Sequence, residues 1–193
     1  MINAGTIVVA DCLVSDCADP RESIRSFVSS LAGATIDFDV AVATSERETG
    51  NRNAAHAHLM RGFGNLENFV DRVLDTYFHQ CSLAISCREL ATTFGYLADG
   101  GEVPGGGKRI VSAERARRIN ALMLTCGTYD RAGELAFEVG LPTKSGVGGG
   151  IVAVVPGKGA IAVWSPALGP SGNSVAGVEA LRRFVVRTGW SVF

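Results

Sequence analysis

The residues best suited to chemistry stand just before a predicted hairpin near the end of the sequence. Lys144, Ser145 and Gly146 precede two apolar runs, 151–155 and 160–164, which a loop with two glycines and a proline separates. These runs predict antiparallel strands, so we expect the triplet on the edge of a small sheet. A Lys-Ser-Gly triplet on such an edge is typical of acyl transfer by a serine, although the same three residues also occur in ordinary loops.

The glycine-rich surroundings of Lys144 also invite comparison with a phosphate-binding loop. That motif needs a glycine before the lysine and a helix after the following serine or threonine. Here Thr143 precedes Lys144, and the residues that follow are strand-like. The sequence therefore argues against nucleotide binding.

The composition indicates one ordinary globular domain. The 193 residues are 47% hydrophobic and carry a formal net charge of −1, which gives no indication of a nucleic-acid or membrane partner. No apolar run approaches the ~20 residues of a membrane span, and Met1 does not open a signal-peptide pattern. We therefore expect a cytoplasmic protein with no nucleic-acid and no membrane partner.

The cysteines and histidines do not form a metal-binding pattern. The five cysteines are dispersed and none belongs to a Cys-x-x-Cys pair, which predicts reduced and mostly buried thiols. His56 and His58 are two residues apart and would point to different faces of a helix, and His79 is alone. We expect no metal and no cofactor.

Periodicity and capping patterns predict a mainly helical first half. Residues 6–15 fit a buried helix or a strand, and Asp19-Pro20 opens a helix that ends near Gly33. An extended linker is expected over 36–42. Ser45 to Glu48 has the form of a capping box, which predicts a helix over about 46–61. Apolar residues at three- and four-residue steps predict an amphipathic helix over 66–80.

The second half alternates helices with the hairpin. A capping box at Ser86 and a cap at Ser112 predict helices that end near Asp99 and Gly127. A short helical or irregular piece is expected over 133–139, and Asn173 is expected to cap a last helix over 175–187. The fold class is therefore α+β, mainly helical with a small antiparallel sheet.

Five ordered blocks of the sequence can be compared with known families. They are MINAG at 1–5, SERETGNRNAA at 45–55, YFHQCS at 77–82, CGTYDRAGELAFEVGLPTKSGVGGG at 126–150 and WSPALGPSGNSVAG at 164–177. Together they resemble the serine-dependent glutaminases, relatives of β-lactamases that hydrolyse the side-chain amide of glutamine. The resemblance covers essentially the whole chain and implies a β-lactamase/transpeptidase-like fold.

The resemblance implies that four residues bind substrate. Asn3, Glu46 and Asn53 match the groups that hold the α-carboxylate and α-ammonium of glutamine, and Tyr77 matches a tyrosine lining the same pocket. Each residue type also has a structural explanation: Glu46 suits the first turn of a helix, the asparagines suit turns and caps, and Tyr77 lies on the apolar stripe of its helix.

The resemblance assigns the chemistry itself to Tyr129 and Val147. Tyr129 matches the general acid and base near the nucleophile, and the backbone N–H of Val147 matches a donor of the oxyanion hole. Both also contact substrate in that comparison. An ordinary tyrosine has a pKa of about 10, so a basic Tyr129 requires a nearby cation such as Lys144 to favour its phenolate.

The nucleophile of this family is the serine of a Ser-x-x-Lys motif that lies upstream of the Asn-Ala-Gly turn. None of the serines here has a lysine three positions later. The resemblance therefore implies a glutaminase domain over 1–193 that is incomplete at its N-terminus, with the first strands and the nucleophile helix missing.

The resulting expectation is a glutaminase that converts L-glutamine to L-glutamate and ammonia through an acyl-serine, with doubtful activity for the 193-residue chain by itself. The family also implies a homo-oligomer, a dimer or tetramer. One alternative is a non-catalytic remnant or fragment that binds glutamine or glutamate. Another is a penicillin-recognising enzyme, which suits the groups for a small α-amino acid less well.

Overall fold

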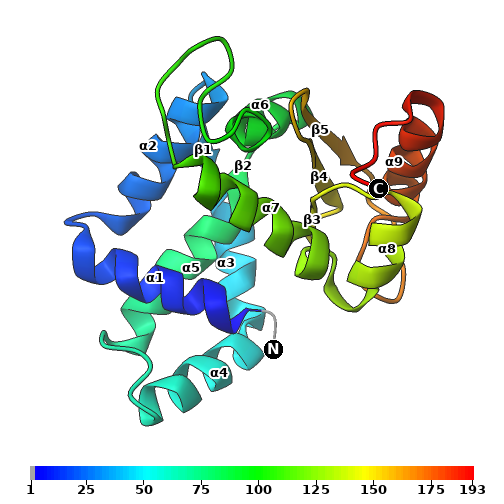
Figure 1. Ribbon diagram of the computed structural model, residues 1–193. Coiled ribbons are helices and arrows are strands. Elements are labelled where there is room, and N and C mark those ends of the chain that lie inside the picture. The colour runs from blue at the N-terminus through cyan, green and yellow to red at the C-terminus, as the bar shows by residue number, and fades with distance from the viewer. Residues whose placement is uncertain (1–2) are drawn as a thin grey trace. The chain divides into compact units, whose positions relative to one another are not determined.

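The computed structural model describes residues 3–193, which form two compact units that meet in sequence between Ile85 and Ser86 (Figure 1). The first unit contains α1 (Ala4–Asp16), α2 (Pro20–Ala32), β1 (Asp37–Phe38), α3 (Val40–Thr49), α4 (Asn51–Gly62), α5 (Val70–Cys81) and β2 (Leu83–Ala84). The second contains α6 (Cys87–Ala98), α7 (Ala113–Cys126), the 3₁₀ turn η1 (Tyr129–Arg131), α8 (Ala132–Glu138), β3 (Thr143–Ser145), β4 (Gly150–Val155), β5 (Gly159–Trp164) and α9 (Val175–Thr188).

The first unit is built around the amphipathic helix α5. Its buried side chains, Val73, Tyr77 and Phe78 among them, form one apolar cluster with Ile7 of α1 and Ala57 of α4. The helix expected over 66–80 is confirmed, with its first turn at Val70, and the apolar segment 6–15 is a helix rather than a strand. Burial of these side chains supplies the main stabilisation of the unit.

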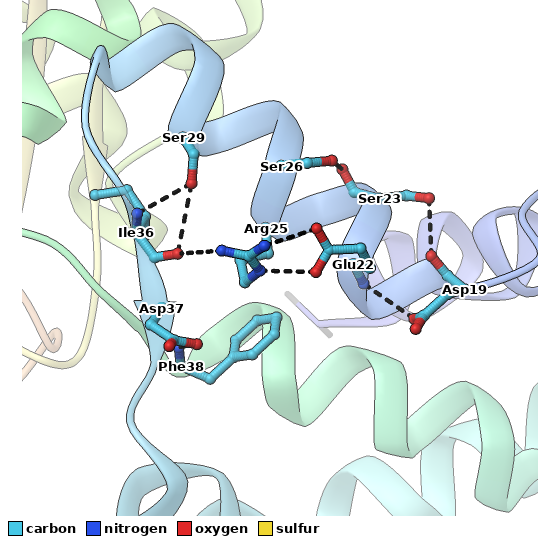
Figure 2. Close-up of polar contacts among 9 residues, drawn as sticks. All are labelled: Asp19, Glu22, Ser23, Arg25, Ser26, Ser29, Ile36, Asp37 and Phe38. Carbon is cyan, nitrogen blue, oxygen red and sulfur yellow. Dashed lines mark hydrogen bonds and ion pairs between the residues drawn. The ribbon is translucent and has the colours of Figure 1, made fainter.

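Helix α2 is fastened to the segment that follows it. Figure 2 shows Arg25 between the Glu22 carboxylate, to which it donates twice at 2.7 Å, and the carbonyl of Ile36 at 3.3 Å. Ser29 accepts from the Ile36 N–H at 3.0 Å. The predicted cap is confirmed, because Asp19 accepts from the Glu22 N–H and the helix ends at Gly33 with φ 66°.

Two expectations for residues 36–61 are wrong. The segment 36–42 is not a linker, because it contains β1 and the first turn of α3, which Asp39 caps through the Val42 N–H. Ser45 lies inside α3, and a second helix begins only after Gly50. The break has a packing reason, because a Cβ at Gly50 would lie 2.8 Å from Cζ of Phe78.

The second unit encloses an antiparallel sheet of order β3-β4-β5. The predicted hairpin is confirmed, with Ile151 opposite Val163 and Ala153 opposite Ile161. Alternate residues of β4 face opposite sides of the sheet. Ile151, Ala153 and Val155 pack in a cluster with α8 and α9, whereas Val152 and Val154 pack with α6 and α7. The strand is therefore buried on both faces, with helices on either side (Figure 1).

The caps of the second unit are mostly those expected. Ser86 forms a capping box with Glu89, and Ser112 caps α7. Asn173 does not cap α9, because the adjacent Ser174 accepts from the Gly177 N–H at 3.1 Å. The side chain of Asn173 is instead buried and bonds elsewhere.

The expectation of mostly buried thiols is wrong. Cys12, Cys81, Cys87 and Cys126 are exposed and Cys17 is half-buried, all as free cysteines. Cys12, for example, points away from the face of α1 that carries Ile7, Ala10 and Val14 to the core. None of the described helices combines the length and the apolar character that crossing a membrane requires.

Candidate active site

Two of the expected substrate-binding residues meet in the first unit. Asn3, at the start of α1, donates from Nδ2 to Oδ1 of Asn53 on α4 at 2.8 Å, across 50 residues of sequence. Neither amide caps a helix here, which removes the structural explanation of both as caps. The bond does not use the Asn3 Oδ1 acceptor or the Asn53 Nδ2 donors, and these groups are of the kind that bind a polar ligand.

Glu46 and Tyr77 both interact with Cys81. The pKa of the Cys81 thiol is raised, first because neighbouring atoms displace solvent from the sulfur and then because of the Glu46 carboxylate, while a hydrogen bond with Tyr77 opposes this. Glu46 is half-buried on α3, and Tyr77 is 5% exposed in the core of the unit. A half-buried carboxylate beside a phenol can accept an ammonium group.

A surface cavity of about 410 Å³ in the same unit lies along α5 and the start of α2. None of the expected site residues lines it. Its carboxylate Asp75 is already paired with Arg21 and Arg47. We therefore do not place the candidate site in this cavity.

In the second unit, Tyr129 has an unusual backbone conformation. Among the described residues it is the one non-glycine residue with a positive φ, 61°. For a residue with a bulky side chain this left-handed conformation costs roughly 1–2 kcal/mol. Such strain persists only where the surrounding structure enforces it, and it is common at active sites.

The segment that leads into Tyr129 is held against β3. The Gly127 carbonyl accepts from the Ser145 N–H at 3.0 Å. A side chain at Gly127 would collide with the carbonyl of Thr143, so only glycine permits this approach. The glycine that was expected to end α7 thus also sets the distance between Tyr129 and the Lys-Ser-Gly triplet.

The phenol of Tyr129 lies at the triplet. Its hydroxyl donates to the Ser145 carbonyl at 3.2 Å, and the Nζ of Lys144 donates to the same carbonyl and lies 5.0 Å from the centroid of the Tyr129 ring. Burial raises the pKa of Tyr129, and a backbone hydrogen bond from Val147 opposes that increase. The phenol is consequently neutral at pH 7, able to donate a proton.

Lys144 is the cation that a basic Tyr129 was expected to need. Its pKa is lowered by burial, an effect that the electrostatic interaction with Cys126 opposes. Lowering the pKa of an ammonium makes its deprotonated form easier to reach. The expected phenolate is not found, because the pKa of Tyr129 is raised by burial and Lys144 lies over the face of its ring.

Val147 occupies the tip of the loop between β3 and β4, with its side chain 67% exposed. The loop is closed by the Gly146 N–H to the Gly150 carbonyl at 2.9 Å, and Trp164 donates from Nε1 to the Gly148 carbonyl at 2.8 Å. A backbone N–H on such an anchored turn is held in a fixed direction, as an oxyanion donor must be.

Two buried hydroxyls beside this group have no hydrogen-bond partner among residues 3–193. They are Oγ1 of Thr128 and Oγ of Ser145, both on residues that are about 1% exposed. Unpaired buried hydroxyls are costly and commonly mark positions that bind a polar ligand. The sequence suggested Ser145 only as a member of the triplet, and it gave no signal for Thr128.

The structure thus brings Asn3 to Asn53 and Tyr129 to Val147 and Lys144, and it places Glu46 and Tyr77 where both interact with Cys81. In the described part of the chain, no group of three or more His, Cys, Asp or Glu residues could hold a metal ion. What the second group offers is a neutral phenol, a lysine of lowered pKa and a fixed backbone N–H. These groups suit proton transfer and stabilisation of a developing oxyanion.

Comparison with known proteins agrees with this chemistry. The family model described as Glutaminase matches residues 1–193. A glutaminase of Vibrio parahaemolyticus is 55% identical over 193 residues, which is the whole of this chain and 63% of that protein. The chain therefore spans less than two thirds of the length of this curated relative.

Solved structures give the same result. A probable glutaminase of Bacillus subtilis superposes with a TM-score of 0.93 at 33% identity, over 100% of this chain and 65% of that one. A Bacillus subtilis glutaminase in covalent complex with 5-oxo-L-norleucine superposes with a TM-score of 0.94 at 33% identity, over 100% and 69%. The expected β-lactamase-like α+β fold is confirmed, and the chain belongs to the glutaminase family.

Proposed function

We propose that this chain carries substrate-binding and acid–base residues of a glutaminase, which hydrolyses L-glutamine to L-glutamate and ammonia. Similarity to glutaminases over the whole of this chain supports the reaction class. The observation that carries the proposal is the position of Tyr129, which holds a strained backbone and directs a neutral phenol to the Lys-Ser-Gly triplet. We further propose that residues 1–193 are part of one glutaminase domain.

In this proposal Glu46, Asn3 and Asn53 recognise the amino-acid end of glutamine. The Glu46 carboxylate accepts from the α-ammonium, and Nδ2 of Asn53, whose Oδ1 accepts from Asn3, donates to the α-carboxylate. Tyr77 contributes its phenol to the same group. The glutamate form in which one structural relative was solved supports an amino-acid ligand.

We propose that Val147 and Tyr129 act on the reacting amide. A serine nucleophile attacks the γ-carboxamide, and the Val147 N–H stabilises the oxyanion that develops on the carbonyl oxygen. Tyr129 gives its proton to the departing ammonia and takes up the proton that the serine hydroxyl loses, so the protons balance. Water then releases glutamate from the acyl-serine. No serine of the 193 residues stands in a Ser-x-x-Lys motif, so the nucleophile is not assigned to a residue of this chain.

Binding tests the proposal directly. Titration calorimetry of the chain with L-glutamate is expected to give saturable binding, and Glu46→Gln is expected to weaken it about tenfold or more, because a hydrogen bond to a charged group is lost. Glu48→Gln is the matched control, since Glu48 lies on the same helix and is exposed. Equal affinities in all three proteins would contradict the role of Glu46.

A chain that binds glutamate without turnover is the second candidate, since Glu46, Asn3 and Asn53 alone support binding. It differs from the first in ammonia release, which it does not catalyse even when a serine nucleophile is supplied.

We also propose that the protein forms a homo-oligomer, a dimer or tetramer, and that it is cytoplasmic. Sedimentation velocity tests the oligomer, and a single monomeric species at all concentrations would contradict it.

A further inference from the structure

Asn173 is a buried polar residue that the proposed chemistry does not use. It is 2% exposed and precedes α9 without capping it. Its Nδ2 donates to the Thr128 carbonyl at 3.1 Å and to Oγ of Ser171 at 3.0 Å, whereas its Oδ1 has no partner in the described part of the chain. Burying an amide whose oxygen has no partner costs free energy. The burial of Asn173 therefore requires an explanation, and its bond to Thr128 suggests one.

The Thr128 carbonyl belongs to the peptide group that precedes Tyr129. The φ angle of Tyr129 is the rotation about its N–Cα bond, which directly follows this peptide group. Fixing the direction of the Thr128 carbonyl therefore restricts φ of Tyr129. Two donors hold the carbonyl, Nδ2 of Asn173 and the N–H of Arg131 at 3.3 Å. The Arg131 bond is local to the turn, and Asn173 supplies the constraint from a distant part of the sequence.

The loop that carries Asn173 also passes close to the Tyr129 side chain. A Cβ at Gly172, whose φ is 81°, would lie 3.6 Å from Cε2 of Tyr129 and 3.8 Å from Cγ1 of Val147. The Gly169 N–H closes the loop by donating to the Asn173 carbonyl at 2.9 Å. One short loop therefore bonds to the peptide that precedes Tyr129 and lies near its ring.

We propose that Asn173 is a positioning residue for Tyr129: its side-chain amide fixes the Thr128 carbonyl and, through it, the left-handed backbone that directs the phenol to Ser145 and Val147. The importance of this position for catalysis rests on the function proposed for Tyr129. The positioning itself is independent of that function and can be measured without substrate.

The test compares Asn173→Ala with a matched control, Asn120→Ala. Asn120 also donates from Nδ2 to a backbone carbonyl, that of Leu97 at 2.9 Å, and its Oδ1 is likewise unpartnered in the described part of the chain. The sequence has three tyrosines, so labelling with ¹³C at Cζ gives three signals that single Tyr→Phe variants assign. Amide hydrogen exchange of Arg131 provides a second measurement.

Asn173→Ala is expected to shift or split the Tyr129 signal and to leave those of Tyr77 and Tyr96 in place. The protection of the Arg131 amide should fall about fivefold, as expected for the loss of one hydrogen bond that supports its acceptor. Asn120→Ala should leave both Tyr129 measurements at their original values. An unchanged Tyr129 signal in Asn173→Ala, or equal changes in both variants, would overturn the proposal.

A measurement on the unsubstituted chain covers the case in which Asn173→Ala does not fold. The Nδ2 protons of Asn173 should exchange with water much more slowly than those of the exposed Asn65. Equal exchange would also refute the positioning role. Because none of these measurements involves glutamine, failure here is distinct from failure of the glutaminase proposal.

Discussion

At the scale of single residues, the candidate site depends on backbone conformation as much as on side-chain chemistry. Tyr129 is held at a positive φ, and Gly127 permits the close approach to β3 that places the phenol at the triplet. A hydroxyl within reach of Ser145 and Val147 results from these two backbone features together. Substitutions that alter them should affect the site without removing any reactive group.

Gly127→Ala tests the close approach. The added Cβ would collide with the Thr143 carbonyl, so we expect a loss of about 2–3 kcal/mol in the free energy of unfolding. Gly133→Ala is the control, because a Cβ on this helical residue meets nothing within 4 Å, and it should stabilise by about 0.5–1 kcal/mol. Urea titration followed by tryptophan fluorescence measures both, since Trp164 and Trp190 lie in the second unit. Equal stabilities of the two variants would contradict the packing argument.

The family resemblance suggested the residues of the candidate site, but not the residues that support them. The Asn3–Asn53 contact and the proximity of Tyr129 to Lys144 agree with the residues expected to act together. Asn173 was expected to cap the last helix, but the adjacent Ser174 does so, and one cap suffices. Asn173 is then available for a long-range bond, and sequence cannot say where that bond goes.

At the scale of elements, buried polar residues join helices that local patterns predict separately. Asp11 on α1 accepts from the N–H groups of Glu67 and Asn68 at 2.9 Å each and from the Asn68 side chain. These bonds fasten the turn before α5 to α1. Burial raises the pKa of Asp11, but the hydrogen bonds and the charge of Arg61 outweigh it, so the pKa lies below its usual value.

Asp11→Asn is expected to destabilise the chain by about 1.5–3 kcal/mol at pH 7, because hydrogen bonds to a charged group are lost. Asp16→Asn on the exposed end of the same helix should be nearly neutral. Far-UV circular dichroism in urea follows the unfolding of this helical unit. A loss no larger for Asp11→Asn than for Asp16→Asn would show that the turn does not depend on the carboxylate.

Local patterns predicted helices better than they predicted helix ends. The Ser45 pattern matches a capping box, yet Asp39 starts the helix six residues earlier and Gly50 ends it. The reason is tertiary, because Gly50 lets the chain pass close to Phe78 of α5. Where no such contact intervenes, as at Ser86, the predicted capping box is present.

At the scale of the whole molecule, several carboxyl groups have lowered pKa values, which sets the response to acid. Hydrogen bonds from Arg182 and Arg183 lower the pKa of Glu179 to about 2. The pKa of Glu179 in the folded protein lies below its pKa in the unfolded chain. The bonds between Glu179 and the two arginines therefore stabilise the protein above about pH 4.3, and this stabilisation is lost as the pH falls toward 2. Asp11 and Glu134 respond with the same sign.

Glu179→Gln separates this effect from general acid denaturation. The variant should have a lower urea midpoint than the unsubstituted chain at pH 6, and the difference should shrink as the pH falls from 4 toward 2, where the carboxylate becomes protonated. Glu114→Gln serves as control, because Glu114 is exposed and its ion-pair partner, Arg118, is 3.9 Å away. A difference between Glu179→Gln and the unsubstituted chain that stays constant from pH 6 to pH 2 would refute the linkage.

The measurement that tests the central claim most directly is glutamine hydrolysis by a chimera. Residues 1–193 replace the aligned part of the Vibrio parahaemolyticus glutaminase, which supplies the remainder of that protein. We predict ammonia release from L-glutamine, and a loss of about 10²–10⁴-fold in kcat for Tyr129→Phe with little change in KM. A folded chimera that binds glutamate but releases no ammonia, or one that Tyr129→Phe leaves fully active, would contradict the account.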